Sequence, residues 1–224
     1  ARASGTLDDL NKHKRNFPII FKFYKYYPDD FIAEDARPML RYVMITTYIG
    51  GILLILNTIV SLFCLLPGPK DTNQKSKAAP IFFAFIYLLV VYPLSLELML
   101  MPLYNALKDG KGLKYVGFLF TYAIYFAFFV YLTIGLGDYG SVGWINSINL
   151  TGATENKWVG IMAIIFSIGA TGFCVLIGWI WLVAFRYFKN NDIKSKAIGE
   201  AAVAAGKYAS DHKDEIAQAA RDNP

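Results

Sequence analysis

The sequence has little of the chemistry that most enzymes and secreted domains require. It contains two cysteines and two histidines in 224 residues, and charged residues make up only 17% of the chain. Cys64 and Cys174 lie in apolar runs, which excludes a disulfide framework for a secreted domain, and their spacing fits no metal site. We interpret both as packing residues, with lipidation or redox roles as alternatives. His13 and His212 lie in polar terminal stretches, so no nucleophile–base pair or metal cluster is evident. We therefore expect no catalytic residues, no metal and no cofactor.

Long apolar runs are abundant instead, and hydrophobic residues make up 55% of the chain. A hydrocarbon core about 30 Å thick needs about 20 helical residues to span it, and four runs reach that length. The runs are continuous, whereas membrane β-barrels have alternating segments of about ten residues. The predicted fold class is an all-α integral membrane protein with four transmembrane helices. The predicted spans cover about 42–66, 79–100, 115–137 and 158–185, within a membrane domain of 42–185.

The distribution of basic residues predicts how the spans are oriented. If both termini and the loop at 108–114 share one side, that side has eighteen Lys and Arg residues and the other has four. Basic residues favour the cytoplasmic side, so we predict an N-in/C-in topology. The segments 1–41 and 186–224 would then be cytoplasmic, the latter as an Ala-rich tail. Basic flanks also explain the net charge of +5, so we expect no nucleic-acid partner.

Aromatic and basic residues alternate between residues 17 and 31, before the first span. Tyr and Phe favour the headgroup zone and Lys favours anionic lipid, whereas proline disfavours a continuous helix. We interpret this stretch as an extended segment lying on the cytoplasmic leaflet. A loop packed on the helix ends and a peptide read by a sorting adaptor are the alternatives. The residues expected at the membrane interface are Phe21, Lys22, Tyr24, Lys25 and Tyr27.

The fourth span has small residues at four-residue spacing, Ala163, Ser167 and Thr171. Such a stripe lets helix backbones approach closely. We favour packing within the chain, with a homo-oligomer as the alternative. Asn149 begins an Asn-Leu-Thr sequon in the third loop, which makes it a candidate glycosylation site on the predicted lumenal side.

Several ordered motifs resemble those of the secretory carrier-associated membrane proteins (SCAMPs). The resemblance covers roughly residues 16–200 and includes an aromatic, acidic-ended segment before the first span, a short peptide between spans two and three, and a glycine-tryptophan turn after span three. A basic exit from span four and a Lys-Ala-x-x-Glu pattern complete it. The segments are Asn16–Pro18, Tyr27–Phe31, Pro102–Gly110, Gly143–Ile145, Phe185–Phe188 and Lys196–Glu200.

The resemblance implies a non-enzymatic tetraspan protein of post-Golgi and endosomal carriers, acting in vesicle trafficking, recycling or exocytic fusion. It also implies that the peptide between spans two and three binds acidic lipid, including phosphoinositides, and that other vesicle membrane proteins are partners. The corresponding residues here are Tyr104, Lys108, Lys111 and Lys114. The chain departs from the family pattern because it lacks Asn-Pro-Phe repeats, an N-terminal coiled coil and the cysteines before span one. Adaptor binding through such repeats is therefore not implied.

Two hypotheses for the function follow. In the first, cytoplasmic segments 17–31 and 101–116 lie flat on the leaflet, insert aromatic side chains beside headgroups and attract anionic lipid. In the second, the chain is a transporter or channel subunit that uses Glu97, the charged residue inside span two. Glu97 lies toward the predicted cytoplasmic end, where it could instead reach water or pair with Arg41.

Overall fold

The computed structural model describes residues 26–63, 78–136, 139–152 and 157–212, and all secondary structure within them is helical. Four stretches are long and apolar enough to cross a membrane, as predicted: Arg37–Phe63, Ala79–Asp109, Gly112–Ile134 and Lys157–Asn190. The helices are α2 (Pro28–Phe31), α3 (Arg37–Phe63), α4 (Ala78–Ile86), α5 (Tyr92–Ser95), α6 (Met101–Asp109), α7 (Gly112–Ile134), α8 (Trp144–Gly152), α9 (Lys157–Asn190) and α10 (Ile193–Asp211).

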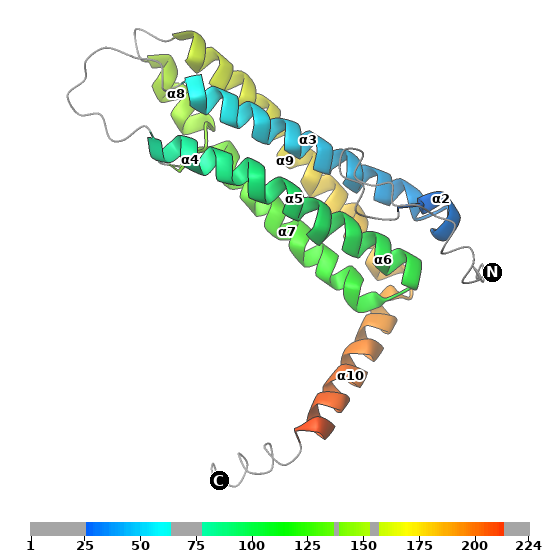
Figure 1. Cartoon of the computed structure of the whole chain (residues 1–224). Coiled ribbons are helices and arrows are strands. Elements are labelled where there is room, and N and C mark those ends of the chain that lie inside the picture. The colour runs from blue at the N-terminus through cyan, green and yellow to red at the C-terminus, as the bar shows by residue number, and fades with distance from the viewer. Residues whose placement is uncertain (1–25, 64–77, 137–138, 153–156, 213–224) are drawn as a thin grey trace.

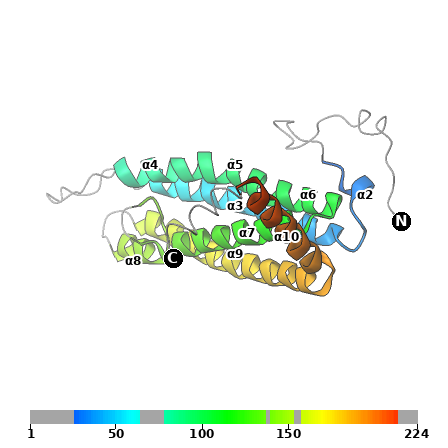
Figure 2. The ribbon, with the colours of Figure 1, turned by 90° about the horizontal axis from the view of Figure 1, so that it is seen from below.

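The four spans lie side by side as an elongated bundle (Figure 1; Figure 2). The short helix α2, the turn between α6 and α7 and the start of α10 lie together at one end, which we call the basic end. The short helix α8 lies at the opposite end. After its first turns α10 projects away from the bundle. This arrangement agrees with an even number of crossings, and the basic end is the one predicted to face the cytoplasm.

The second span is one column made of α4, α5 and α6 joined by two π-helical turns, η1 (Tyr87–Val91) and η2 (Leu96–Leu100). A proline follows shortly after each π-turn, Pro93 after η1 and Pro102 after η2. Proline removes a backbone donor and its ring crowds the carbonyl four residues earlier. The wider turn accommodates that crowding, so the column continues past both prolines to Asp109.

Aromatic side chains on one face of α7 form much of the core. Tyr115, Phe118, Tyr122 and Phe129 are essentially fully buried, and their spacing of three, four and seven residues places them on a single stripe. The Tyr122 and Thr46 hydroxyls are hydrogen-bonded at 3.1 Å. Aromatic rings thus fill much of the interior of the bundle, and the buried Tyr122 hydroxyl has a hydrogen-bond partner there.

Adjacent glycines on α3 let two of its neighbours approach closely. A Cβ on Gly50 would overlap the Tyr125 hydroxyl, and one on Gly51 would lie 2.6 Å from the Tyr92 ring. Larger residues would therefore push α5 and α7 away from α3.

A break separates α7 from α8, and α8 continues along α9 where α7 stops. The Leu119 carbonyl on α7 accepts a hydrogen bond from Trp181, whereas Ser147 on α8 is bonded to Ser167 at 2.9 Å. Gly135 ends α7 in the left-handed conformation, with a φ of 73°. Such a break at membrane depth is tolerated where protein covers the freed backbone groups.

Asn57 on α3 covers that break. Its side-chain amide donates to the Gly140 carbonyl at 2.7 Å and accepts from the Val142 amide at 3.0 Å. The Ser141 hydroxyl donates to the Leu132 carbonyl at the end of α7. A single fully buried amide therefore satisfies both a donor and an acceptor of the loop.

The helices extend beyond the predicted spans, mainly toward the basic end. The second span was predicted to stop near residue 100, but it continues through α6 to Asp109. The fourth was predicted to end at 185, and α9 continues to Asn190. Hydropathy detects only the apolar part of a helix, so amphipathic last turns were missed.

Candidate functional site

The turn between α6 and α7 is tight and is built on one glycine. Gly110 ends α6 in the left-handed conformation, with a φ of 65°, and the Lys111 amide donates to the Ala106 carbonyl at 3.1 Å. Lys111 is extended and α7 begins at Gly112. Residues 101–116 therefore form a packed helical hairpin, and the prediction that they lie flat on the leaflet is wrong.

Glu200 on α10 caps the start of α7. Its two carboxylate oxygens accept hydrogen bonds from the Gly112 amide at 3.3 Å and the Leu113 amide at 2.9 Å. The first amides of a helix have no intrahelical partner, and the helix dipole favours a negative charge there. Lys111, in the capping position, makes no side-chain cap, so the distant carboxylate takes that role.

Close backbone contact holds α10 in this position. A Cβ on Gly112 would overlap the Ala197 backbone and lie 2.5 Å from the Ile193 carbonyl oxygen. Ala197 is itself buried. The Lys-Ala-x-x-Glu pattern thus has a structural role, since alanine permits the contact and glutamate makes the cap.

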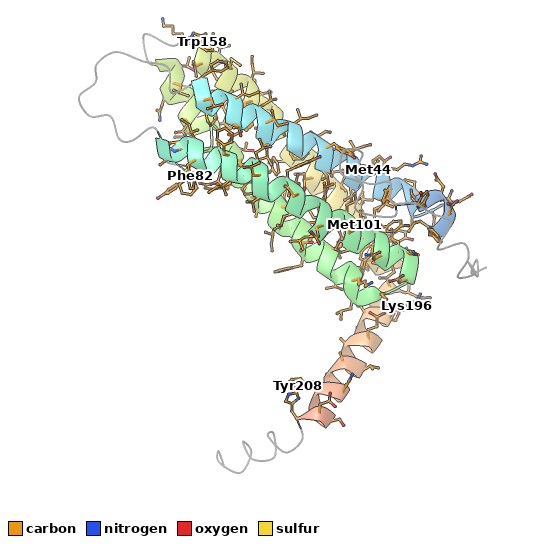
Figure 3. All side chains as sticks on the ribbon, viewed as in Figure 1. Met44, Phe82, Met101, Trp158, Lys196 and Tyr208 are labelled. Atoms are coloured by element: carbon orange, nitrogen blue, oxygen red, sulfur yellow. The ribbon has the colours of Figure 1, made fainter. Side chains whose placement is uncertain are left out.

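The three predicted lysines surround the turn but differ in their surroundings. The Lys114 ammonium lies 2.9 Å from the Asp109 carboxylate, and the Lys108 ammonium lies 4.4 Å from the centre of the Phe31 ring. Lys111 is exposed. Lys196, which was not among the predicted residues, places its ammonium 3.8 Å from where a Cβ on Gly110 would lie, at the junction of α10 with the bundle (Figure 3).

Tyr104 does not belong to this exposed group. It is only 3% exposed, its ring centre lies 5.1 Å from that of Tyr26, and its hydroxyl accepts from the Tyr27 amide at 3.4 Å. Its assignment as a lipid-binding residue is therefore wrong, because the segment before α2 covers it. Burial, followed by the neighbouring Tyr104, raises the pKa of Tyr26 above its usual range, so Tyr26 stays neutral at physiological pH.

The aromatic-basic segment is described only from residue 26. Phe21, Lys22, Tyr24 and Lys25 lie outside the described residues, so their predicted place at the interface stays a prediction. Tyr27 is half-buried at the start of α2.

Arg37 ties α2 to the start of α3. It donates to the Ile32 carbonyl at 2.9 Å and to the Asp29 carbonyl at 2.7 Å. Arg41 lies 3.6 Å from the Asp29 carboxylate rather than pairing with Glu97. The aspartate of the aromatic segment thus neutralises the basic residues that begin the first span.

The small-residue stripe of the fourth span faces α8. Ser167 is bonded to Ser147, and Thr171 accepts from the Trp144 indole at 2.9 Å. Ala163 is buried on the same side. Asn149 is exposed on α8, while its sequon partner Thr151 donates to the Ser147 carbonyl at 2.8 Å. Use of this sequon stays a prediction.

The described part of the chain brings no three His, Cys, Asp or Glu side chains together in a metal-binding group. Within it, the functional residues that sequence reasoning missed are Glu200, Lys196 and Asn57. The first two belong to the Lys-Ala-x-x-Glu pattern, which was recognised without a role. Asn57 gave one signal, a carboxamide inside an apolar span.

Comparisons with known proteins give one consistent result. The sequence model of the SCAMP family matches residues 14–191. The chain is 28% identical over 189 residues to secretory carrier-associated membrane protein 4 of Arabidopsis thaliana, which covers 79% of this chain and 65% of the relative. It is 26% identical over 144 residues to secretory carrier-associated membrane protein 5 of Homo sapiens, covering 61% of this chain and 58% of the relative. The chain thus spans about three fifths of the length of these relatives. No solved structure matches it.

Proposed function

The chain belongs to the SCAMP family, and from that premise we propose that it is a non-enzymatic organiser of carrier membranes. It would act in vesicle trafficking, recycling or exocytic fusion between the trans-Golgi network, recycling endosomes, secretory vesicles and the plasma membrane. Support comes from the family match and from four spans whose interior is packed with aromatic side chains.

The basic end would carry out this function by holding anionic lipid headgroups, including phosphoinositides. The observation that carries the proposal is the arrangement of Lys108, Lys111 and Lys196 around the Gly110 turn. Lys108 and Lys111 lie two residues before and one residue after Gly110, and α10 brings the Lys196 ammonium next to the same glycine. Each lysine near an anionic surface contributes about 1 kcal/mol.

The lipid-binding surface proposed here is a folded hairpin and not a peptide that lies flat on the leaflet. The hairpin is held by the Glu200 cap and by Tyr104 packed under Tyr26, so its lysines project from a rigid scaffold. Less conformational entropy is lost when a headgroup binds to a pre-arranged cluster. Lys114, already paired with Asp109, would contribute less than Lys111.

The proposal is tested with the full chain reconstituted in vesicles of neutral lipid with or without a fluorescent phosphoinositide. Lys111→Ala combined with Lys196→Ala should weaken lipid association about 30-fold, at about 1 kcal/mol for each lysine. Lys157→Ala is the matched control, because Lys157 is exposed at the opposite end of the bundle. Equal association by the double variant and the control would refute lipid binding at the turn. Proximity labelling in the native cell would identify the compartment.

Two features favour this proposal over transport. Away from the first and last two turns of the four described spans, Glu97 is the one charged side chain, and it is exposed on the outside of the bundle. A transport pathway requires polar groups facing the bundle interior or a water-filled cavity. A carboxylate on the outer surface is more consistent with contact to something beside the bundle.

A further inference from the structure

The second column has the smallest share of buried residues among the four spans. Within its most apolar stretch only 17% of the residues are buried, compared with 56% for α3 and 39% for each of the other two spans. Large apolar side chains lie exposed along it, including Phe85, Leu89 and Leu94. This surface, which we call the outer face, begins near Phe82 on α4 (Figure 3) and continues to η2.

Glu97 lies on this outer face at membrane depth. It is exposed within η2, and at a rise of about 1.5 Å per residue it is about 16 Å along the column from Lys108. Among the described residues it forms no salt bridge, and Arg41 is paired with Asp29. A carboxyl group beside the exposed side chains of Leu94 and Leu98 is thus presented to the outside at a depth where lipid solvates a charge poorly.

The π-helical turn η2 keeps the Glu97 side chain on the outside of the bundle. Its neighbours Leu96, Met99 and Leu100 are buried against the bundle, which prevents the column from rotating Glu97 inward. The Leu98 carbonyl accepts a hydrogen bond from Thr121 at 2.8 Å and fixes the turn against α7. π-turns occur often at functional sites because they redirect a side chain.

We propose that the outer face binds the transmembrane helix of another membrane protein, through an ion pair between Glu97 and a Lys or Arg of that helix. The partner's basic residue lies in the membrane leaflet on the side of the basic end, at the depth of Glu97. Apolar contacts with Leu89 and Leu94 complete the interface. Charge complementarity identifies this partner, since an ionised pair in lipid is far less costly than a lone carboxylate.

A second copy of this chain does not fit the same role. The interiors of its own described spans contain no Lys or Arg, so a second copy offers no cation to Glu97, and two ionised Glu97 side chains meeting across a two-fold axis would repel each other. The inference is also independent of lipid binding at the α6–α7 turn, because the two surfaces lie at different heights on the bundle.

The test uses the full chain in neutral vesicles without phosphoinositide, so that it cannot fail with the lipid-binding proposal. The probes are single-span Leu/Ala helices that carry one Lys, one Glu or one Leu at the depth of Glu97. Association is measured by energy transfer between labelled probe and labelled chain. The Lys helix should bind at least tenfold more tightly than the Leu helix. Glu97→Gln should remove that preference, and Glu97→Lys should transfer it to the Glu helix.

Two controls keep the result specific to the outer face. Glu97→Leu combined with Trp179→Glu moves the carboxylate to an exposed position on α9, and this variant should bind the Lys helix no better than Glu97→Leu alone. The charge swap provides a gain of binding that loss of folding cannot produce. The proposal would be overturned if the Lys and Leu helices bound equally, or if the preference for the Lys helix persisted in Glu97→Gln. It would also be overturned if the variant with Trp179→Glu bound the Lys helix as tightly as the unaltered chain does, or if the chain self-associated in a way that depends on Glu97.

Discussion

The two ends of the bundle satisfy free backbone groups with side chains from distant parts of the chain, but they use different chemistry. At the basic end, the charged Glu200 on α10 caps the amides that begin α7. At the opposite end, the neutral Asn57 on α3 satisfies the loop between α7 and α8. An ionised carboxylate is stable where water is near, whereas an amide suits a buried site, because an uncharged group costs less to desolvate. Burial therefore determines which kind of cap each end can use.

The strongest test of this comparison removes the neutral cap. Asn57→Leu keeps a similar volume but leaves the Gly140 carbonyl and the Val142 amide buried without their partner. Each unsatisfied buried group costs about 1–3 kcal/mol, so the free energy of unfolding in detergent should fall by about 2–6 kcal/mol. Asn149→Leu makes the same chemical change at an exposed position of α8 and should have little effect. A loss no larger than that of the control would show that the break does not depend on Asn57.

A smaller effect is expected from forcing α10 away from the hairpin. Gly112→Ala places a methyl group into the Ala197 backbone, and overpacking of this kind costs about 1–3 kcal/mol. Gly117→Ala on the same helix is the control, because nothing lies within 4 Å of the added Cβ. Spin-label distances between α7 and α10 should increase only in Gly112→Ala. Unchanged distances would contradict the close contact of these helices.

The smallest effect is expected from removing the charged cap alone. Glu200→Ala should destabilise the start of α7 by about 1 kcal/mol, the usual value of a helix cap. Hydrogen exchange of the Leu113 amide should become about fivefold faster. Glu200→Gln keeps a hydrogen-bond acceptor and should show an intermediate rate, because only the interaction with the helix dipole is lost. If Leu113 exchanges at the same rate in all three proteins, the cap does not form in solution.

The sequence predicted what depends on composition and local pattern. Apolar length alone defined four helices, because each span must satisfy its backbone groups internally in lipid. Gly110 and Gly135 end α6 and α7 in the left-handed conformation, and neither stop was predicted, since the third span was expected to run to about residue 137. The predicted helix ends were less accurate, because the last turns of α6 and α9 are polar on one side and so do not continue the apolar run.

The rest depended on contacts between residues far apart in the chain. Tyr104 looked like an interfacial tyrosine, and only the packing of Tyr26 over it shows that it is buried. Glu200 is separated from Gly112 by the whole of α7, α8 and α9, so its capping role follows from the packing of the first turns of α10 against the start of α7. Asn57 could be noticed as a polar residue within a span, but its two backbone partners could not be identified without the fold.

The length of α9 has a mechanical consequence. With 34 residues it is about 51 Å long, well beyond the roughly 30 Å of bilayer hydrocarbon. It must tilt or protrude, and it has no described interruption at which to bend. Ser167, in the first third of α9, is bonded to Ser147 of α8, and the Tyr187 hydroxyl near the other end donates to the Asp35 carboxylate. A change in membrane thickness that alters the tilt of α9 would therefore move α8 and the segment before α3 together.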